Sequence, residues 1–149
     1  MGGNMLLRRV LTIFALAAIA ATATATPVMA APAGGVETMA TSTCNRWISY
    51  NGADVPAYGS NVNCSLRRGN ANSAVFQLQV TMNVCYEWVL RSQGVYPLTA
   101  DSSFGPATEK ALRAVQSAVA TPSDGVYGPN TRKAIYHQGS NGTSCRQVP

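Results

Sequence analysis

The chain has 149 residues, with 11 Lys and Arg against 6 Asp and Glu, and its formal net charge at pH 7 is +5. An excess of this size suits solubility and gives only weak attraction to an anionic surface at physiological salt. Because the basic residues are scattered and no known nucleic-acid-binding motif occurs, we expect no nucleic-acid partner.

Residues 1–30 have the pattern of a secretory signal peptide. Arg8 and Arg9 precede an apolar run over 10–21, and Val28-Met29-Ala30 offers the small residues that signal peptidase requires. The run is shorter than the roughly 20 apolar residues of a membrane-spanning helix, so we expect cleavage before Ala31 and no stable membrane anchor afterwards. The paired arginines also resemble a twin-arginine signal, but disulfide formation in a reducing cytoplasm argues against that route.

The segment that follows cleavage is predicted to begin with a disordered leader and a hairpin. Residues 31–43 are rich in Pro, Gly, Thr and Ala and show no apolar periodicity. Residues 46–50 and 53–58 then flank Asn51-Gly52, a pair that favours a tight two-residue turn. We place this hairpin in an extension over 44–65, ahead of a helical domain over 66–138 and a tail over 139–149.

Four cysteines lie beyond the signal peptide. An even number in an exported chain indicates two disulfides, for which three connectivities exist. We favour Cys44 with Cys64, closing the hairpin extension, and Cys85 with Cys145, tying the tail to the first helix. A metal site is the rival, but no C-x-x-C occurs and His137 is the single histidine, so we expect no metal and no other cofactor.

A long helix is predicted from Ser73 to about Arg91, capped by Asn72 or Ser73. Its core stripe at helical spacing comprises Val75, Leu78, Met82, Tyr86 and Val89. A second flank carries Thr81, Cys85 and Trp88, and we expect the hairpin or the tail to cover it. Trp88 is then either part of a satellite core or, in the sharper hypothesis, a platform on which a sugar stacks.

The most informative pattern is a phrase that occurs twice. Residues 104–112, FGPATEKAL, return 23 positions later as residues 127–135, YGPNTRKAI, and Asp101 and Asp124 each stand three residues before the aromatic. Gly followed by Pro suits the start of a helix, because Pro lacks an N–H that would be unpaired there. Each copy therefore predicts an acidic turn followed by a helix.

This phrase, preceded by Leu66-x-x-Gly69 and by the Val75–Met82 pattern, resembles the small three-helix peptidoglycan-binding domain of bacterial wall hydrolases. The resemblance covers about Leu66 to Tyr136 and implies an all-α, compact three-helix bundle. The chain departs from the family at Asp101-Ser102, where Asp-Gly is usual, and at Val115-Gln116, where Phe-Gln is usual. With the hairpin and two disulfides added, this is the fold we predict.

The paired aspartates admit two hypotheses. Carboxyls roughly 5 to 10 Å apart can serve as general acid and base on a glycosidic bond. Because the two occur in repeated turns, we favour a structural role in which each accepts backbone N–H groups of its own turn. The structural set is Asp101, Gly105, Thr108, Asp124, Gly128 and Thr131.

The resemblance implies that the ligand is peptidoglycan glycan or stem peptide, bound in a shallow groove between helices and turns. Helix N-termini there offer N–H groups to carboxylates, and aromatic side chains suit sugar faces. The candidate ligand-binding residues are Tyr96, Ser102, Ser103, Phe104, Arg113, Gln116, Tyr127 and Asn130. Phe104 and Tyr127 are equally plausible as core residues.

The sequence favours a secreted, non-catalytic binding module. It has no G-x-S-x-G elbow, and His137, expected at the end of the third helix, has no evident nucleophile or orienting acid. The alternatives are a small secreted inhibitor or protein-interaction protein on the same scaffold and, less favoured, a wall-lytic enzyme. A separate wall hydrolase is a further conceivable partner.

Overall fold

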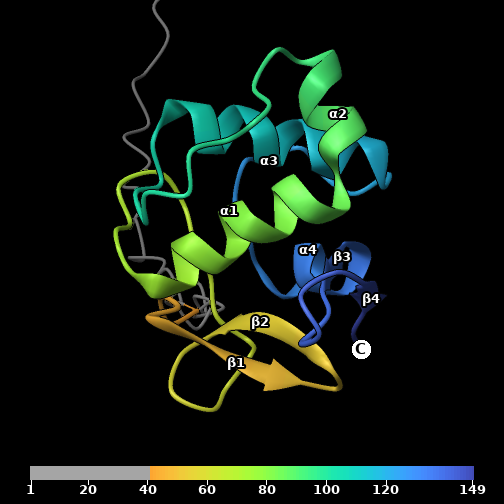
Figure 1. Cartoon of the computed structure of the whole chain (residues 1–149). Coiled ribbons are helices and arrows are strands. Elements are labelled where there is room, and N and C mark those ends of the chain that lie inside the picture. The colour runs from red at the N-terminus through yellow and green to blue at the C-terminus, as the bar shows by residue number, and fades with distance from the viewer. Residues whose placement is uncertain (1–40) are drawn as a thin grey trace, which may run out of the picture. The chain divides into compact units, whose positions relative to one another are not determined.

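The computed structural model describes residues 41–149 (Figure 1). These residues form four helices and two small sheets, one of which is the hairpin. The elements are, in order, β1 (Arg46–Tyr50), β2 (Ala53–Ala57), α1 (Ser73–Cys85), α2 (Glu87–Ser92), α3 (Pro106–Ala118), α4 (Pro129–Ala134), β3 (Tyr136–Gln138) and β4 (Cys145–Gln147). Within this range no helix has the length and apolar character that crossing a bilayer requires. The predicted signal peptide and all but residues 41–43 of the predicted leader lie outside the described residues.

The predicted hairpin is confirmed. Strands β1 and β2 pair antiparallel, with Tyr50 opposite Ala53. Asn51 and Gly52 both have positive φ, 50° and 76°, as the tight turn requires. The β2 side chains form a small core with Val62 and with Val148 near the end of the chain, so the tail packs against the hairpin.

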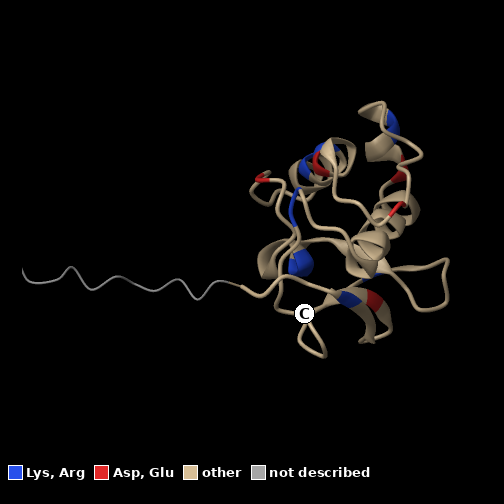
Figure 2. Ribbon diagram, turned by 90° about the vertical axis from the view of Figure 1, so that its left-hand side faces the viewer, with Lys and Arg blue, Asp and Glu red and all other residues tan. Residues whose placement is uncertain are grey.

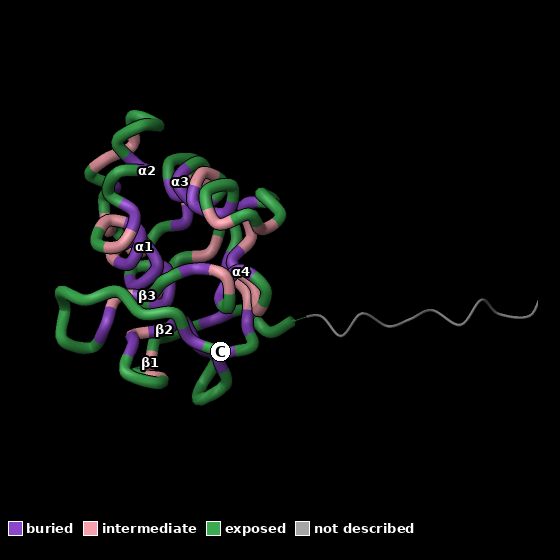
Figure 3. The backbone as a smooth tube through the Cα atoms, turned by 90° about the vertical axis from the view of Figure 1, so that its right-hand side faces the viewer, coloured by how far each residue is buried: buried purple, intermediate pink, exposed green. Residues whose placement is uncertain are grey.

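The main core lies between α1, α3 and the two repeated turns. All five residues of the predicted α1 stripe are buried in it, together with Leu112 and Val115 of α3. Figure 3 shows buried positions along α1 and β2 and on part of α3.

The predicted single helix over 73–91 is wrong in one respect, because it breaks at Tyr86. There the backbone has φ −132° and ψ 27°, and α2 begins at the next residue. The Tyr86 hydroxyl accepts a hydrogen bond from the backbone N–H of Tyr136 at 2.7 Å, and Cys85 is bonded to Cys145. The hydrogen bond joins the break to β3, and the disulfide joins it to β4 in the tail.

The C-terminal part corrects the all-α prediction. Helix α4 ends at Ala134, Ile135 is extended with ψ 155°, and β3 and β4 pair antiparallel. His137 therefore lies in a strand and not at a helix end. The domain is mainly helical with two two-stranded sheets, and both favoured disulfides, Cys44–Cys64 and Cys85–Cys145, are confirmed.

Candidate functional site

A buried glutamine organises the first repeated turn. Asp101 Oδ1 accepts hydrogen bonds from the Ser103 backbone N–H and from Gln79 Nε2, both at 2.9 Å. The Gln79 amide also donates to Thr108 Oγ1 at 3.0 Å, and its oxygen accepts the Ser102 N–H at 3.1 Å. One amide from α1 thus holds the turn and the start of α3 together.

The second turn repeats this network with Gln116 of α3. Its amide donates to Asp124 Oδ1 at 2.8 Å and to Thr131 Oγ1 at 3.0 Å, and its oxygen accepts the Gly125 N–H at 2.9 Å. Asp124 also accepts the Val126 N–H at 2.9 Å. These are the contacts that a turn-bracing role of the aspartates and threonines requires.

Three predicted ligand-binding side chains are buried. Gln116 is fully enclosed in its network, Phe104 is 1% exposed and Tyr127 is 0% exposed. Phe104 pairs its backbone with Gly69 and Asn70, and Tyr127 pairs with Leu66. The prediction that these three side chains contact ligand at the surface is corrected, because they face the core. For Phe104 and Tyr127 the alternative of a core residue holds.

The glycines of the two phrases sit at helix N-caps. Gly105 and Gly128 have extended backbones, and Pro106 and Pro129 follow as the first helical residues. This is the helix start that the sequence predicts at both copies. The two helix starts are alike, but α4 ends after six residues whereas α3 has thirteen.

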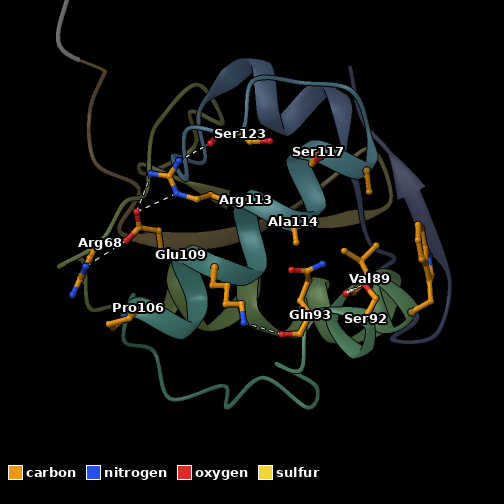
Figure 4. Close-up of a pocket in the computed structure, with 13 residues that line it drawn as sticks. Arg68, Val89, Ser92, Gln93, Pro106, Glu109, Arg113, Ala114, Ser117 and Ser123 are labelled. Carbon is orange, nitrogen blue, oxygen red and sulfur yellow. Dashed lines mark hydrogen bonds and ion pairs between the residues drawn. The ribbon is translucent and has the colours of Figure 1, made fainter.

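A cleft of about 780 Å³ lies between α2 and α3. Trp88 and Val89 line it from α2, Glu109, Lys110 and Arg113 line it from α3, and Arg68 lies at its edge. In Figure 4, Arg68, Glu109, Arg113 and Ser123 gather at one end, while Val89 and Ser92 of α2 lie at the other. The cleft therefore has a charged end and an α2 wall.

The charged end is held by its own ion pairs. Glu109 Oε1 lies 2.9 Å from Arg113 Nη2, and Glu109 Oε2 lies 3.7 Å from Arg68 Nη1. Arg113 also donates to the Ser123 carbonyl at 2.5 Å, and Lys110 donates to the Gln93 carbonyl at 2.9 Å. With three cations and one carboxylate, the cleft is net positive. Elsewhere in residues 41–149 the basic residues are distributed over β1, α2, α4, β4 and the loop before α1 (Figure 2).

Trp88 is 68% exposed, the highest fraction among the exposed large apolar side chains of residues 41–149. The prediction that hairpin or tail would cover it is wrong. Strand β3 and the tail do contact the rest of that flank, since the Gln138 N–H donates to Thr81 Oγ1 and Cys85 is bonded to Cys145. The indole stands in solvent at the cleft, where a flat ligand can stack on it.

A second cavity of about 440 Å³ lies between residues 94–99 and the start of α3. It brings together Tyr96 and Ser103, two predicted ligand-binding residues, with Asp101 and Thr108. The hydrogen bonds from Gln79 and then Ser103 lower the pKa of Asp101 below its ordinary value, so its carboxylate is ionised at neutral pH.

The predicted ligand-binding residues are therefore dispersed. Arg113 lines the cleft, Tyr96 and Ser103 line the second cavity, and Ser102 and Asn130 line neither. Sequence reasoning missed Arg68 and Lys110. Lys110 could have been found, because it shares one face of α3 with Arg113, Ala114 and Ser117 at helical spacing.

Comparison with known proteins gives one family. A family described as "Putative peptidoglycan binding domain" matches residues 87–135, which contain α2, α3, both turns and α4. No curated protein matches.

Two solved structures are similar over about half of the chain. The N-terminal domain of SleB is 31% identical, with a TM-score of 0.36, and the match covers 47% of this chain and 85% of that one. A peptidoglycan-binding protein from Clostridioides difficile, in complex with glutamine hydroxamate, is 30% identical, with a TM-score of 0.37. That match covers 48% of this chain and 39% of the other. Over residues 87–135 the chain belongs to the peptidoglycan-binding domain family.

Proposed function

We propose that the protein is a secreted, non-catalytic module that binds peptidoglycan through the cleft between α2 and α3. The observation that carries this proposal is the exposed indole of Trp88 in the same cleft as the Arg68–Glu109–Arg113 cluster. An exposed aromatic and convergent charged groups in one concavity are what a ligand site for an amphipathic molecule needs.

Peptidoglycan offers partners for both parts of the cleft. The apolar face of an N-acetylated sugar can stack on the indole, since an aromatic ring with a polar N–H suits a contact that stays partly exposed to water. Carboxylates of the stem peptide can form charge-assisted hydrogen bonds with Arg113 and Arg68, whose planar groups match a carboxylate in geometry.

The location at the cell wall rests on two supports. The predicted signal peptide over 1–30 directs export, and the two disulfides need an oxidising compartment to form and persist.

Sedimentation of the purified, oxidised protein with insoluble peptidoglycan tests the proposal. Trp88→Ala and Arg113→Ala should each weaken binding by fivefold or more, since truncation of a central anchor typically costs over about 1 kcal/mol. Trp47→Ala and Arg46→Ala are the matched controls, because both are exposed on β1 outside the cleft and should bind like the parent.

If the parent stays in the supernatant, the proposal is wrong and the protein-interaction alternative takes its place. The non-catalytic part is tested separately by a zymogram, in which the protein should leave embedded cell walls intact. Clearing that Asp101→Asn abolishes would establish the enzyme alternative instead.

A further inference from the structure

The cleft and the second cavity adjoin at the start of α3. Pro106 lines both, and the consecutive residues Gln93 and Gly94 line one each. A single extended ligand can therefore reach from one into the other.

The two concavities carry opposite charge. The cleft has Arg68, Lys110 and Arg113 against Glu109. Asp101 is the one charged side chain among the residues lining the second cavity. A ligand that spans both meets positive charge at one end and negative charge at the other.

Asp101 has a carboxylate oxygen to offer. Gln79 and Ser103 both bond to Oδ1, and no residue among 41–149 donates to Oδ2. The exposed Ser103 and the half-buried Tyr96 line the same cavity, whereas the Thr108 hydroxyl is already bonded to Gln79 Nε2 and to the Ser103 carbonyl. A primary ammonium group has three N–H donors, which suits a carboxylate oxygen beside hydroxyl groups.

Two cations lie near the second cavity. Lys110 Nζ donates to the carbonyl of Gln93, next to Gly94 of the cavity lining. The Arg91 guanidinium stands 4.1 Å from the centre of the Tyr96 ring. Its charge is offset by Glu87, whose Oε1 lies 2.8 Å from Arg91 Nε. The Arg91–Glu87 pair is thus neutral as a unit, and Lys110 belongs to the lining of the cleft, so Asp101 supplies the charge of the second cavity's lining.

The repeat supplies an internal comparison. Asp124 makes the same contacts in the second turn as Asp101 makes in the first, yet it lines neither concavity. The position of Asp101 beside the second cavity is therefore not explained by its turn-bracing contacts, which Asp124 makes without lining either concavity.

We propose that the wall ligand is a zwitterionic stem peptide, with its carboxylates in the cleft and the free ammonium group of a diamino-acid side chain at Asp101. This assignment rests on the proposed function of the cleft. It adds a specificity: uncrosslinked peptides with a free amine bind better than those whose amine is acylated.

The first test compares sedimentation with peptidoglycan before and after chemical N-acetylation of its free amines. The parent should bind the acetylated wall about two- to fivefold more weakly, the range expected of an exposed ion pair. Asp101→Asn should bind both preparations equally, at the lower level. The asparagine keeps an oxygen that can accept the bonds of Gln79 and Ser103, so the turn persists.

Asp124→Asn is the matched control, since it makes the same change in the sister turn. It should distinguish the two wall preparations as the parent does, and thermal unfolding of both variants reports any damage to the turns. A parent that binds both preparations equally overturns the ammonium site while the proposed function stands. A parent that binds neither overturns both.

A second arm separates stem peptide from de-N-acetylated glucosamine, which also carries an amine. The competitors are the tripeptide L-Ala-γ-D-Glu-L-Lys, its Nε-acetyl form, and glucosamine oligomers. The free tripeptide should displace the protein from the wall at lower concentration than the acetylated one. Displacement by glucosamine oligomers with no difference between the two peptides would overturn the assignment to stem peptide.

Discussion

Tyr127 Oη lies 3.0 Å from Nε2 of His137, and both side chains are fully buried. The rings meet edge to face, with centroids 6.0 Å apart. This hydrogen bond joins the second repeated turn to strand β3. Burial, and then the nearby Arg132, lower the pKa of His137 to about 3, so the imidazole is neutral in the folded protein.

His137 should make the fold sensitive to mild acid. An unfolded histidine has a pKa of about 6.5, so below that pH the unfolded chain binds a proton at His137 and the folded chain does not. The free energy of unfolding should fall as the pH drops from about 6.5 towards 5, approaching 1.4 kcal/mol per pH unit. Urea unfolding at several pH values measures this slope.

His137→Gln is the control for that slope. His137 is the single histidine of the chain, and the carboxylate of Asp101, whose pKa is lowered, contributes its own acid sensitivity mainly below about pH 5. The variant should therefore show a nearly flat stability between about pH 6.5 and 5. An unchanged slope in the variant would rule out His137 as its source.

Tyr127→Ala should lower the free energy of unfolding by about 3–5 kcal/mol, because it removes a large core side chain and leaves His137 without its hydrogen-bond partner. Arg113→Ala, on the exposed side of α3, should shift stability by under about 0.5 kcal/mol while it weakens wall binding. Thermal unfolding and sedimentation of both variants check this separation. Near-native stability of Tyr127→Ala would show that the ring is not a core element.

The sequence predicted the features that depend on neighbouring residues. The Asn51-Gly52 hairpin and the two Gly-Pro helix starts follow from local backbone preferences, and all are present. The break at Tyr86 could not be predicted, because it depends on the bond of its hydroxyl to Tyr136, fifty residues away. Helical periodicity continues through the break, since Val89 still lies in the core.

The site was harder to predict than the fold. Repetition correctly singled out the aspartates and threonines, but the buried amides of Gln79 and Gln116 that connect them come from the preceding helices. In the sequence alone, a polar residue such as Gln116 suggests an exposed ligand contact, because its buried hydrogen-bond partners are not known. The exposure of Trp88 depends on where the distant tail packs, and no local sequence pattern predicts that position.

Gln116→Ala should destabilise the domain by roughly 1–3 kcal/mol for each buried group it leaves unpaired, chiefly the Gly125 N–H, since the Thr131 hydroxyl keeps its bond to the Val126 carbonyl. Gln93→Ala is the control, because that side chain is exposed and only its backbone carbonyl binds Lys110. Urea unfolding should show a large shift for the first and almost none for the second. Similar small shifts would mean that water replaces the Gln116 amide.

Ser102→Gly should stabilise the protein. Ser102 has φ +66°, the left-handed conformation that the equivalent Gly125 adopts at φ +72°. A side chain in that conformation costs roughly 1 kcal/mol, so glycine should raise the free energy of unfolding by about that amount. The converse change, Gly125→Ala, should destabilise, because a Cβ there would also lie 2.9 Å from Arg113 Nε and 3.0 Å from Glu109 Cγ. Urea unfolding of Ser102→Gly, Gly125→Ala and the parent measures both changes.

Since Ser102 lines neither concavity, Ser102→Gly should also sediment with peptidoglycan as the parent does. Weaker sedimentation of a more stable variant would show that the Ser102 hydroxyl contacts the ligand.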